Sequence, residues 1–362
     1  MNLRAIALAS VVVLSNSVAA SEDFGPVPAI DADAALASLG KRLFFDVRLS
    51  GDASTACASC HNPDHAFSDG MALSNAYPGS GHFRNTPTLV NTAQRRVWMH
   101  DGRMGTNLND VTREMITESY LMNMDMRLMQ ERIKQDPVYV KMFDKAGLGE
   151  PSNGGVRNAI PEYLKTLISR GAAFDTGSMT DSARLGFDLF KRKAGCAQCH
   201  TVPRFSDDHP HNTGVPENND IWSDPTRHVT YVTYAKFMGV EDYMNLRRDV
   251  GAYVRTHTAD GSDIGRFITP TLRELKYTAP YMHNGVFETL DEVVDFYSKG
   301  GGDDPNKDPR LAPLNLSKDE KADLIEFLMS LSGDPLTGKE FVWSSEIPKD
   351  YPPIADWRAV DN

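Results

Sequence analysis

The stretches CASCH at residues 57–61 and CAQCH at residues 196–200 decide the fold of this chain. In each, two cysteines are separated by two residues and followed at once by a histidine, which is the attachment motif of a c-type haem. The thiols would form thioethers with the haem vinyl groups, and the histidine would bind the iron. Redox-active disulfides and zinc knuckles are the alternatives, but two copies of the motif favour two covalently bound haem c cofactors. The residues that would hold them are Cys57, Cys60, His61, Cys196, Cys199 and His200.

The two motifs have similar surroundings in the sequence. Residues 32–45 precede the first motif and residues 181–190 precede the second, and both segments have apolar side chains at helical spacing. A Phe-Ser-Asp element follows each motif, at residues 67–69 and 205–207. This weak internal repeat predicts a mainly α-helical protein with two cytochrome c-like lobes, each holding one covalently bound haem, and with long loops.

Further helices are expected, with loops between them. A proline after Asp136 would interrupt the first of these helices, and residues 216–263 are expected to form loops with short helical pieces. The expected helices are residues 122–143, 159–168, 290–297 and 318–331.

The first twenty residues have the pattern of a secretory signal peptide. Arg4 supplies a positive charge, residues 5–14 are apolar, and small residues precede Ser21. An uncleaved anchor is the alternative, but the apolar run is short for a membrane span. We therefore expect a cleaved signal and a periplasmic protein. Four cysteines in an exported chain ordinarily suggest two disulfides, but here each pair belongs to a haem motif.

The composition excludes several classes of function. The chain has 362 residues, of which 41% are hydrophobic and 24% charged, as expected for a folded protein of about two domains. Its formal net charge of -11 argues against binding to nucleic acid and allows steering towards a basic partner. No internal stretch is long and apolar enough to predict a membrane span.

Four segments beyond the haem motifs resemble the bacterial dihaem cytochrome c peroxidase and MauG superfamily. They are RNTPT at residues 84–88, DGR at 101–103, TPTLR at 269–273 and TAPYMHNG at 278–285. The resemblance spans about residues 36–331. It implies a peroxidase-type oxidoreductase in which hydrogen peroxide reacts at the first haem.

On this basis we expect four parts in the chain. They are the signal peptide at residues 1–20, an N-terminal peroxidatic haem c lobe at 21–165, a C-terminal haem c lobe at 166–333 and an extended tail at 334–362.

The ligand on the distal side of the second iron separates the branches of this superfamily. The resemblance places it seventeen residues after Pro280, which is Tyr297. Classical peroxidases have methionine at this position, whereas the MauG-like branch has tyrosine. Leu290, Val293, Val294 and Tyr297 would share one helical face, although a tyrosine packed in the core would also satisfy that pattern. Phenolate is a hard anionic ligand that favours ferric and ferryl iron, whereas a thioether favours ferrous iron.

Three functions are left open by these residues. The first, which Tyr297 favours, is a MauG-like enzyme that uses hydrogen peroxide to oxidise tryptophan or tyrosine residues of a partner protein through a bis-ferryl state. The second is a cytochrome c peroxidase that reduces hydrogen peroxide with electrons from a small cytochrome c or cupredoxin. The third is a non-enzymatic dihaem electron carrier, in which both irons would have filled coordination positions.

The superfamily has a tryptophan directly before its Asp-Gly-Arg element, which connects the two haems. Here that position is His100, and Trp98 lies two residues earlier. Either residue could bridge the haems, and Trp98 could also be an ordinary core residue.

The acid-base group of the peroxide pocket also departs from the family pattern, because Leu121 replaces the expected glutamate. If the segment is helical, Glu114, Glu118 and Leu121 share one face. We expect Glu118 to be the displaced acid-base residue, with Glu114 as second choice and a solvated surface role as the alternative for both. His82 does not match the spacing of the histidine that closes the first haem in some classical peroxidases, so that iron is expected to be open.

A calcium ion between the lobes is implied by the resemblance. Its ligands would be the side chain of Asn85 and the main-chain oxygens of Thr278 and Pro280. Oxygen-only ligation suits this hard cation. Without the resemblance, these residues would be interpreted as turn formers.

Overall fold

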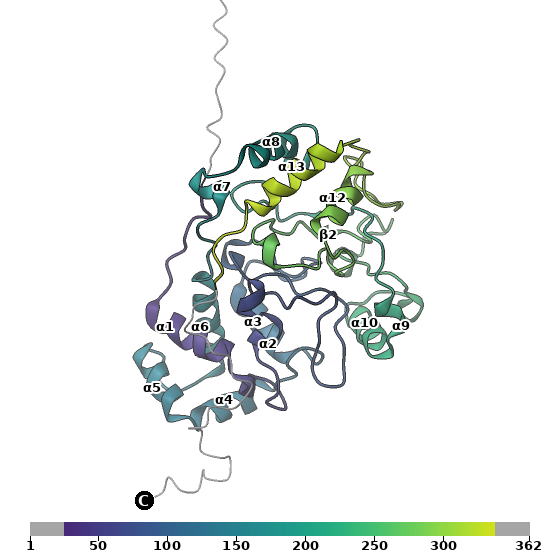
Figure 1. Cartoon of the computed structure of the whole chain (residues 1–362). Helices are drawn as coiled ribbons and strands as arrows, with labels where there is room; N and C mark the ends of the chain where they lie inside the picture. Colours follow the sequence, from purple (N-terminus) through teal and green to yellow (C-terminus); the bar gives the residue numbers. More distant parts are fainter. Residues whose placement is uncertain (1–24, 337–362) are drawn as a thin grey trace, which may run out of the picture.

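Two groups of helices lie at opposite ends of the molecule in the computed structural model, which describes residues 25–336 (Figure 1). The helices of the first group are α1 (Ala34–Phe44), α2 (Cys57–Cys60), α3 (Leu108–Thr117), α4 (Met126–Lys134), α5 (Pro137–Lys145) and α6 (Asn153–Lys165). The helices that follow are α7 (Ala173–Thr176), α8 (Asp181–Lys191), α9 (Asp220–Ser223), α10 (Pro225–Phe237), α11 (Tyr253–Thr256), α12 (Leu290–Ser298) and α13 (Lys318–Met329).

The remaining regular structure is short. Two strands, β1 (Pro210–His211) and β2 (Phe267–Ile268), pair antiparallel. The 3-10 helices are η1 (Val47–Leu49), η2 (Pro63–His65), η3 (Thr92–Gln94), η4 (Cys196–Gln198), η5 (Tyr243–Asn245) and η6 (Leu275–Tyr277). The prediction of a mainly helical chain with long loops is therefore confirmed.

In each lobe, the helix before the haem motif crosses the last helix of that lobe at a glycine. A Cβ atom at Gly40 of α1 would lie 2.0 Å from the main-chain oxygen of Ala159 in α6. A Cβ atom at Gly186 of α8 would likewise lie 2.0 Å from the main-chain oxygen of Asp323 in α13. In each pair, the two helices thus approach each other so closely that only glycine fits at the crossing. This gives the weak sequence repeat a structural counterpart.

The predicted helices that begin at a clear capping residue are found within a few residues of their expected bounds. Asp33 caps α1 by accepting hydrogen bonds from the amides of Ala35 and Leu36. Thr289 and Glu292 form a capping box at the start of α12. Such side chains satisfy amides that the first turn leaves without partners, so the helix start is encoded locally.

Three predicted segments differ from the structure. The helix expected at residues 159–168 is α6, which begins at Asn153 and ends at Lys165. The segment 122–143 is two helices, because Asp125 caps α4 and Asp136 caps α5, and residues 122–125 are not helical. Residues 216–263 contain α10, a helix of 13 residues, where only short pieces were expected. The sequence of α10 mixes threonine, valine and tyrosine on all sides, so its helical period is weak.

Three apolar clusters form the interior. One lies within the first group of helices around Phe44 and Tyr163, and one within the second around Phe205 and Phe327. The third joins the loop that contains Phe83 to helices α9 and α10, which lie together at one side of the molecule (Figure 1).

The predicted signal peptide and nearly all of the predicted C-terminal tail lie outside the described residues. The predicted division between the lobes at residues 165 and 166 falls directly after α6 and stays a prediction. Within residues 25–336, none of the helices has both the length and the apolar character that crossing a bilayer requires.

Candidate active site: two cavities beside the haem motifs

The first motif forms a single helical turn, α2, with His61 directly after it. The Nδ1 atom of His61 lies 2.9 Å from the main-chain oxygen of Phe67. Because a carbonyl oxygen only accepts, Nδ1 carries the proton and Nε2 is left as the metal-binding nitrogen. Desolvation lowers the pKa of His61, which also favours the neutral ring that a metal needs.

The second motif repeats this arrangement. The Nδ1 atom of His200 lies 2.8 Å from the main-chain oxygen of Phe205. Phe67 and Phe205 are the phenylalanines of the two Phe-Ser-Asp elements. The repeated element therefore has a chemical purpose, because it holds each histidine in the same tautomer and orientation.

The four cysteines are free of disulfides, so their sulfur atoms are available for thioether bonds. Desolvation raises the pKa values of Cys57, Cys60 and Cys196 to about 12. These surroundings favour the uncharged thiol when no metal is bound.

A cavity adjoins each motif. The first, of about 200 Å³, is lined by Cys57, Cys60 and His61, and the second, of about 310 Å³, by Cys196, Cys199 and His200. Most of the surface of both cavities is apolar, although the second also has polar and charged side chains in its wall. Two thiols, one oriented imidazole and an apolar hollow are the features that a covalently bound haem requires, so the residues present fit this group.

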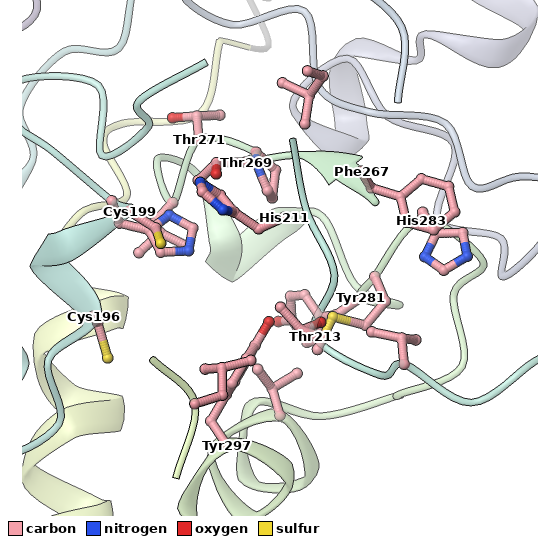
Figure 2. A pocket seen from close by; sticks show the side chains of 18 of the residues that line it. Cys196, Cys199, His211, Thr213, Phe267, Thr269, Thr271, Tyr281, His283 and Tyr297 are labelled. Carbon is pink, nitrogen blue, oxygen red and sulfur yellow. The ribbon is translucent and has the colours of Figure 1, made fainter. Parts of the chain in front are cut away.

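Tyr297 lines the second cavity. It lies on α12, on the same side as Val293 and Val294, and its hydroxyl points into the cavity beside Thr213 (Figure 2). Desolvation raises the pKa of Tyr297 to about 12, and a hydrogen bond with Thr213 opposes this rise. The structure thus brings the predicted distal residue into the cavity of Cys196, Cys199 and His200.

His100 lies in the wall that the two cavities share. It lines both of them, whereas Trp98 lines only the first. The indole Nε1 atom of Trp98 donates to the main-chain oxygen of Thr92 over 3.2 Å, so this side chain is a buried part of the wall. Of the two predicted bridging residues, His100 therefore has the position between the haem sites.

Comparison with known proteins agrees with these features. A family model described as di-haem cytochrome c peroxidase matches residues 34–184. Cytochrome-c peroxidase IdrP2 of Denitromonas iodatirespirans is 44% identical over 344 residues, which cover 92% of this chain and 92% of the relative. The chain belongs to the di-haem cytochrome c peroxidase and MauG family. It is a peroxidase-type oxidoreductase with two haem c cofactors.

Other members of the family are similar over most of their length. Methylamine utilization protein MauG of Methylorubrum extorquens is 35% identical over 310 residues, 82% of this chain and 78% of the relative. The crystal structure of a MauG-like protein associated with microbial copper homeostasis matches with a TM-score of 0.72 at 25% identity, covering 88% of this chain and 96% of that one. The resemblance to this superfamily is thereby confirmed, as is the fold of two cytochrome c-like lobes.

Two of the landmark segments, residues 84–88 and 101–103, meet Asp249 in a buried ionic cluster. Arg84 is paired with Asp101 and Asp249, and Arg103 also contacts Asp101 at 3.0 Å. Arg84, Asp101 and Asp249 are almost completely buried, and the two arginines hold the pKa of Asp101 well below its usual range. Removing one member would leave a buried charge without its partner, which is strongly destabilising.

The two predicted acid-base glutamates are not among the residues that line the first cavity. Helix α3 ends at Thr117, so Glu118 is its C-terminal cap and the predicted shared face with Leu121 is wrong. The Glu118 carboxylate accepts a hydrogen bond from the Ser119 amide at 2.8 Å. Glu114 is paired with Arg103 at 3.7 Å.

His82 and Tyr120 line the first cavity instead. Nδ1 of His82 lies 3.0 Å from the amide nitrogen of Arg84, from which it can accept, and 3.2 Å from the main-chain oxygen of Arg84, to which it can donate. The contact with Arg84 therefore allows both tautomers of the neutral ring. Desolvation lowers the pKa of His82 to about 3. The spacing of His82 to Arg84 argued only against His82 as a ligand that closes the first iron, and the folded loop shows that its side chain reaches the cavity.

The predicted calcium ligands Asn85, Thr278 and Pro280 all line the second cavity. The Nδ2 atom of Asn85 donates to the main-chain oxygen of Met71 over 2.7 Å. Among the described residues, none donates a hydrogen bond to the Oδ1 atom of Asn85, so this oxygen stays available to a cation.

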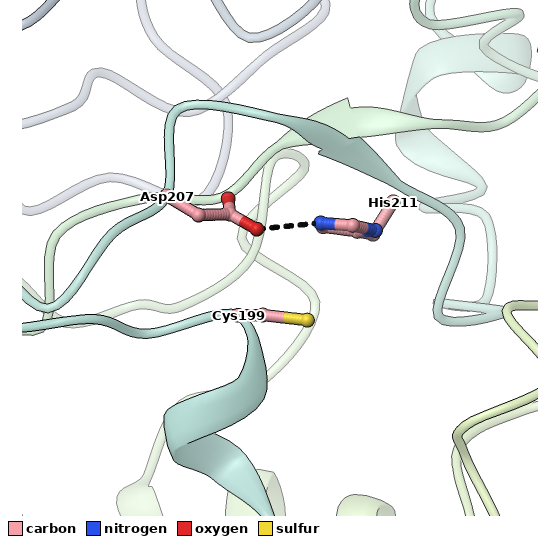
Figure 3. Close-up of side chains that lie close together, drawn as sticks. All are labelled: Cys199, Asp207 and His211. Atoms are coloured by element: carbon pink, nitrogen blue, oxygen red, sulfur yellow. Dashed lines mark hydrogen bonds and ion pairs between the residues drawn. The ribbon is translucent and has the colours of Figure 1, made fainter.

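Cys199, Asp207 and His211 form a cluster whose ligand atoms lie within 4.8 Å of one another (Figure 3). The ring of His211 contacts Asp207 at 2.9 Å and Asp308 at 3.0 Å. Because Cys199 belongs to a haem motif, its sulfur is committed to a thioether and the cluster lacks the thiolate of a metal site. It is better described as a polar edge of the second haem cavity.

Proposed function

We propose that this protein is a periplasmic, MauG-like peroxidase that uses hydrogen peroxide to oxidise residues of a partner protein, with Tyr297 as the distal ligand of the second haem. The observation that supports this is the position of the Tyr297 hydroxyl in the cavity of Cys196, Cys199 and His200. An anionic oxygen ligand stabilises higher oxidation states of iron, whereas thioether sulfur does not. When bound, the two haems supply the redox chemistry of peroxide reduction.

The residues of the chain then have separate tasks. His61 and His200 would hold the irons on their proximal sides, oriented by Phe67 and Phe205. In the first cavity, His82 with Nδ1 donating to the main-chain oxygen of Arg84 would use its free Nε2 to take a proton from peroxide and return it to the oxygen that leaves as water. His100 would connect the two sites through their common wall.

We also propose that a calcium ion binds to the Asn85 side chain and to the main-chain oxygens of Thr278 and Pro280. Support comes from their common position at the second cavity and from the free Oδ1 atom of Asn85. Such an ion would fix the wall that contains His100, because Nε2 of His100 donates to the main-chain oxygen of Asn85.

The deciding experiment replaces the distal oxygen by sulfur or removes it. In Tyr297→Met, the reduction potential of the second haem is expected to rise. When peroxide is added to the fully ferric variant, we expect it to lack the near-infrared absorption that the parent gives. Tyr297→Phe, which keeps the ring without the oxygen, is the matched control for packing. A parent-like spectrum in both variants would remove Tyr297 from the iron and with it the MauG-like proposal.

A second candidate is a cytochrome c peroxidase that takes electrons from a small redox protein. It is favoured by two relatives named cytochrome-c peroxidase, which are 44% and 46% identical to this chain. A classical enzyme needs one-electron reduction before it reacts with peroxide, whereas the MauG-like enzyme reacts in the fully ferric state. Peroxide added to each state separates the two candidates.

A further inference from the structure

Arg95 lies in the wall that the two cavities share. Its side chain lines the cavity of the first haem motif and also that of the second. Desolvation lowers the pKa of His100 to about 4, so this imidazole of the wall is neutral. Among the described residues of the shared wall, Arg95 alone therefore carries a charge. The residues that line both cavities are Asn85, Thr86, Pro87, Thr88, Arg95 and His100.

The guanidinium of Arg95 forms no ion pair with a carboxylate in the described part of the chain. The other arginines that line the two cavities each have such a partner. The pairs are Arg84 with Asp101, Arg103 with Asp101, Arg248 with Asp304, Arg273 with Asp175 and Arg310 with Asp308. Arg95 thus differs from every other arginine of the described cavity walls.

The carboxylate that attracts Arg95 most is already engaged elsewhere. Desolvation lowers the pKa of Arg95 to about 10, and the attraction of Asp208 opposes this fall only in part. Asp208 is paired with Arg204 at 2.5 Å and accepts a hydrogen bond from the amide of Arg96 at 3.3 Å. Two guanidinium groups therefore share one carboxylate, which leaves one positive charge in excess at the shared wall.

Haem is the group that can neutralise this charge. With haems in both cavities, Arg95 would be withdrawn from water on two sides, and a desolvated charge without a counterion is costly. Each haem carries two propionate carboxylates, at the porphyrin edge opposite to its vinyl groups. A guanidinium has five N–H groups in one plane and can donate to two carboxylates at once. Arg95 therefore has the position, the charge and the donors to bind one carboxylate on each side of the wall.

We propose that Arg95 binds a propionate of each haem and connects the two haems electrostatically. A positive charge beside a haem favours the reduced iron, because reduction removes one positive charge from the centre. Arg95 would therefore raise the reduction potentials of both haems together. This inference rests on the two haem c cofactors and is independent of Tyr297 and of the substrate.

The test measures the reduction potentials of both haems in the holoprotein by spectroelectrochemistry. Arg95→Gln removes the charge and keeps much of the side-chain volume. We expect the equilibrium constant for reduction of each haem to fall by about tenfold, which is about 59 mV for a one-electron couple. Because the haems would shield the contact from water, the shift is expected to persist in about 1 M salt.

Two further variants separate this contact from a general effect of charge. Arg96→Gln is the matched control, because Arg96 is the next residue, is exposed and lines neither cavity. It loses the same charge outside the wall, and its potentials are expected to equal those of the parent. Arg95→Lys keeps the charge without the planar fork, and its potentials are expected to lie closer to the parent's than those of Arg95→Gln. Equal shifts in Arg95→Lys and Arg95→Gln would mean that the charge is not the cause, and the proposal would be wrong.

A crystal structure of the unmodified holoprotein tests the same contact without a substitution. We expect guanidinium nitrogens of Arg95 to lie within about 3 Å of a carboxylate oxygen of each haem. A guanidinium that contacts Asp208 and neither haem would overturn the proposal.

The outcomes are distinct from those for the proposed function. Tyr297→Met is expected to change the potential of the second haem alone, whereas Arg95→Gln is expected to change both. A shift at only one haem in Arg95→Gln would overturn the connection between the haems. Parental potentials at both haems would overturn propionate binding by Arg95 as well. Either result would leave the proposal for Tyr297 intact.

Discussion

The Nε2 atom of His100 lies 2.9 Å from the main-chain oxygen of Asn85, within the wall that separates the two haem cavities. Desolvation, with Arg84 as the next contribution, lowers the pKa of His100 to about 4, so the ring is neutral at pH 7. A neutral imidazole that donates through Nε2 is fixed in one tautomer. Its π-system therefore stands in a defined orientation between the two haem sites.

His100→Ala is expected to slow electron transfer between the haems by about tenfold or more. His100 is the only aromatic side chain, among the described residues, that lines both cavities. Stopped-flow absorbance at the two haem bands after rapid reduction measures the rate. Trp98→Phe serves as the control, because Trp98 lines the first cavity alone. Slow electron transfer between the haems in Trp98→Phe, together with the parental rate in His100→Ala, would instead assign the bridge to the tryptophan.

His82→Ala is expected to reduce the rate of the peroxide reaction by about 10²- to 10⁴-fold, the usual contribution of a general acid-base group. Its imidazole lines the first cavity, and when Nδ1 donates to the main-chain oxygen of Arg84, Nε2 is free to take a proton from peroxide and return it. Single-turnover kinetics at several peroxide concentrations give the second-order rate constant. Glu118→Gln is the matched variant and is expected to keep the parental rate. The opposite pattern would restore Glu118 to the role that the sequence first suggested.

The same histidine makes the stability of the protein depend on pH. Desolvation lowers the pKa of His82 to about 3 in the folded state, against about 6.5 in the unfolded chain. Between these values the unfolded state binds more protons, so stability is lost as the pH falls below about 6.5. We expect His82→Gln to abolish a loss of about 2 kcal/mol between pH 6.5 and pH 4.5. Denaturant unfolding at both pH values measures this change in the free energy of unfolding. The same loss of stability in parent and variant would contradict the expectation.

Parts of this site could be predicted from the sequence where the residues that determine them lie close together along the chain. The haem motifs and the capped helices α1 and α12 are encoded within a few residues, so their chemistry and bounds could be predicted. His82 could not, because its loop is held by a contact distant in sequence: Arg227 of α10 donates to the main-chain oxygens of Ser74 and His82. Local spacing carries no information about such a contact.

The misplaced glutamate has a similar cause. The helical pattern of α3 continues in the sequence past Thr117, but Tyr120 and Met122 are buried in two different clusters. The chain therefore leaves the helix at Glu118, and the amides of Leu121 and Asn123 both bond to the main-chain oxygen of Glu118. Tertiary packing overrides the local helical preference at this point.

Calcium removal is expected to loosen the wall around His100. If Asn85 is a ligand, Asn85→Ala is expected to abolish stoichiometric calcium in elemental analysis of the purified protein. At calcium concentrations about a hundredfold above the Kd, the bound ion would contribute about 2.7 kcal/mol to the free energy of unfolding. A chelator is expected to destabilise the parent by this amount and to leave Asn85→Ala unchanged. A parent without calcium would contradict the proposal.

The helix crossings test the architecture without involving the haem chemistry. In Gly186→Ala, the new Cβ would lie 2.0 Å from the main-chain oxygen of Asp323 and 2.8 Å from Cβ of Phe327. Because a backbone atom of α13 cannot rotate away, α8 and α13 must separate, at an expected cost of about 1–3 kcal/mol in unfolding free energy. Gly154→Ala in α6 is the matched control, because no atom lies within 4 Å of its Cβ position. It is expected to stabilise the protein by about 0.4–1 kcal/mol through reduced freedom of the unfolded chain. Equal effects of the two substitutions in denaturant unfolding would mean that the crossing is looser than the structure has it, since alanine would then fit both positions alike.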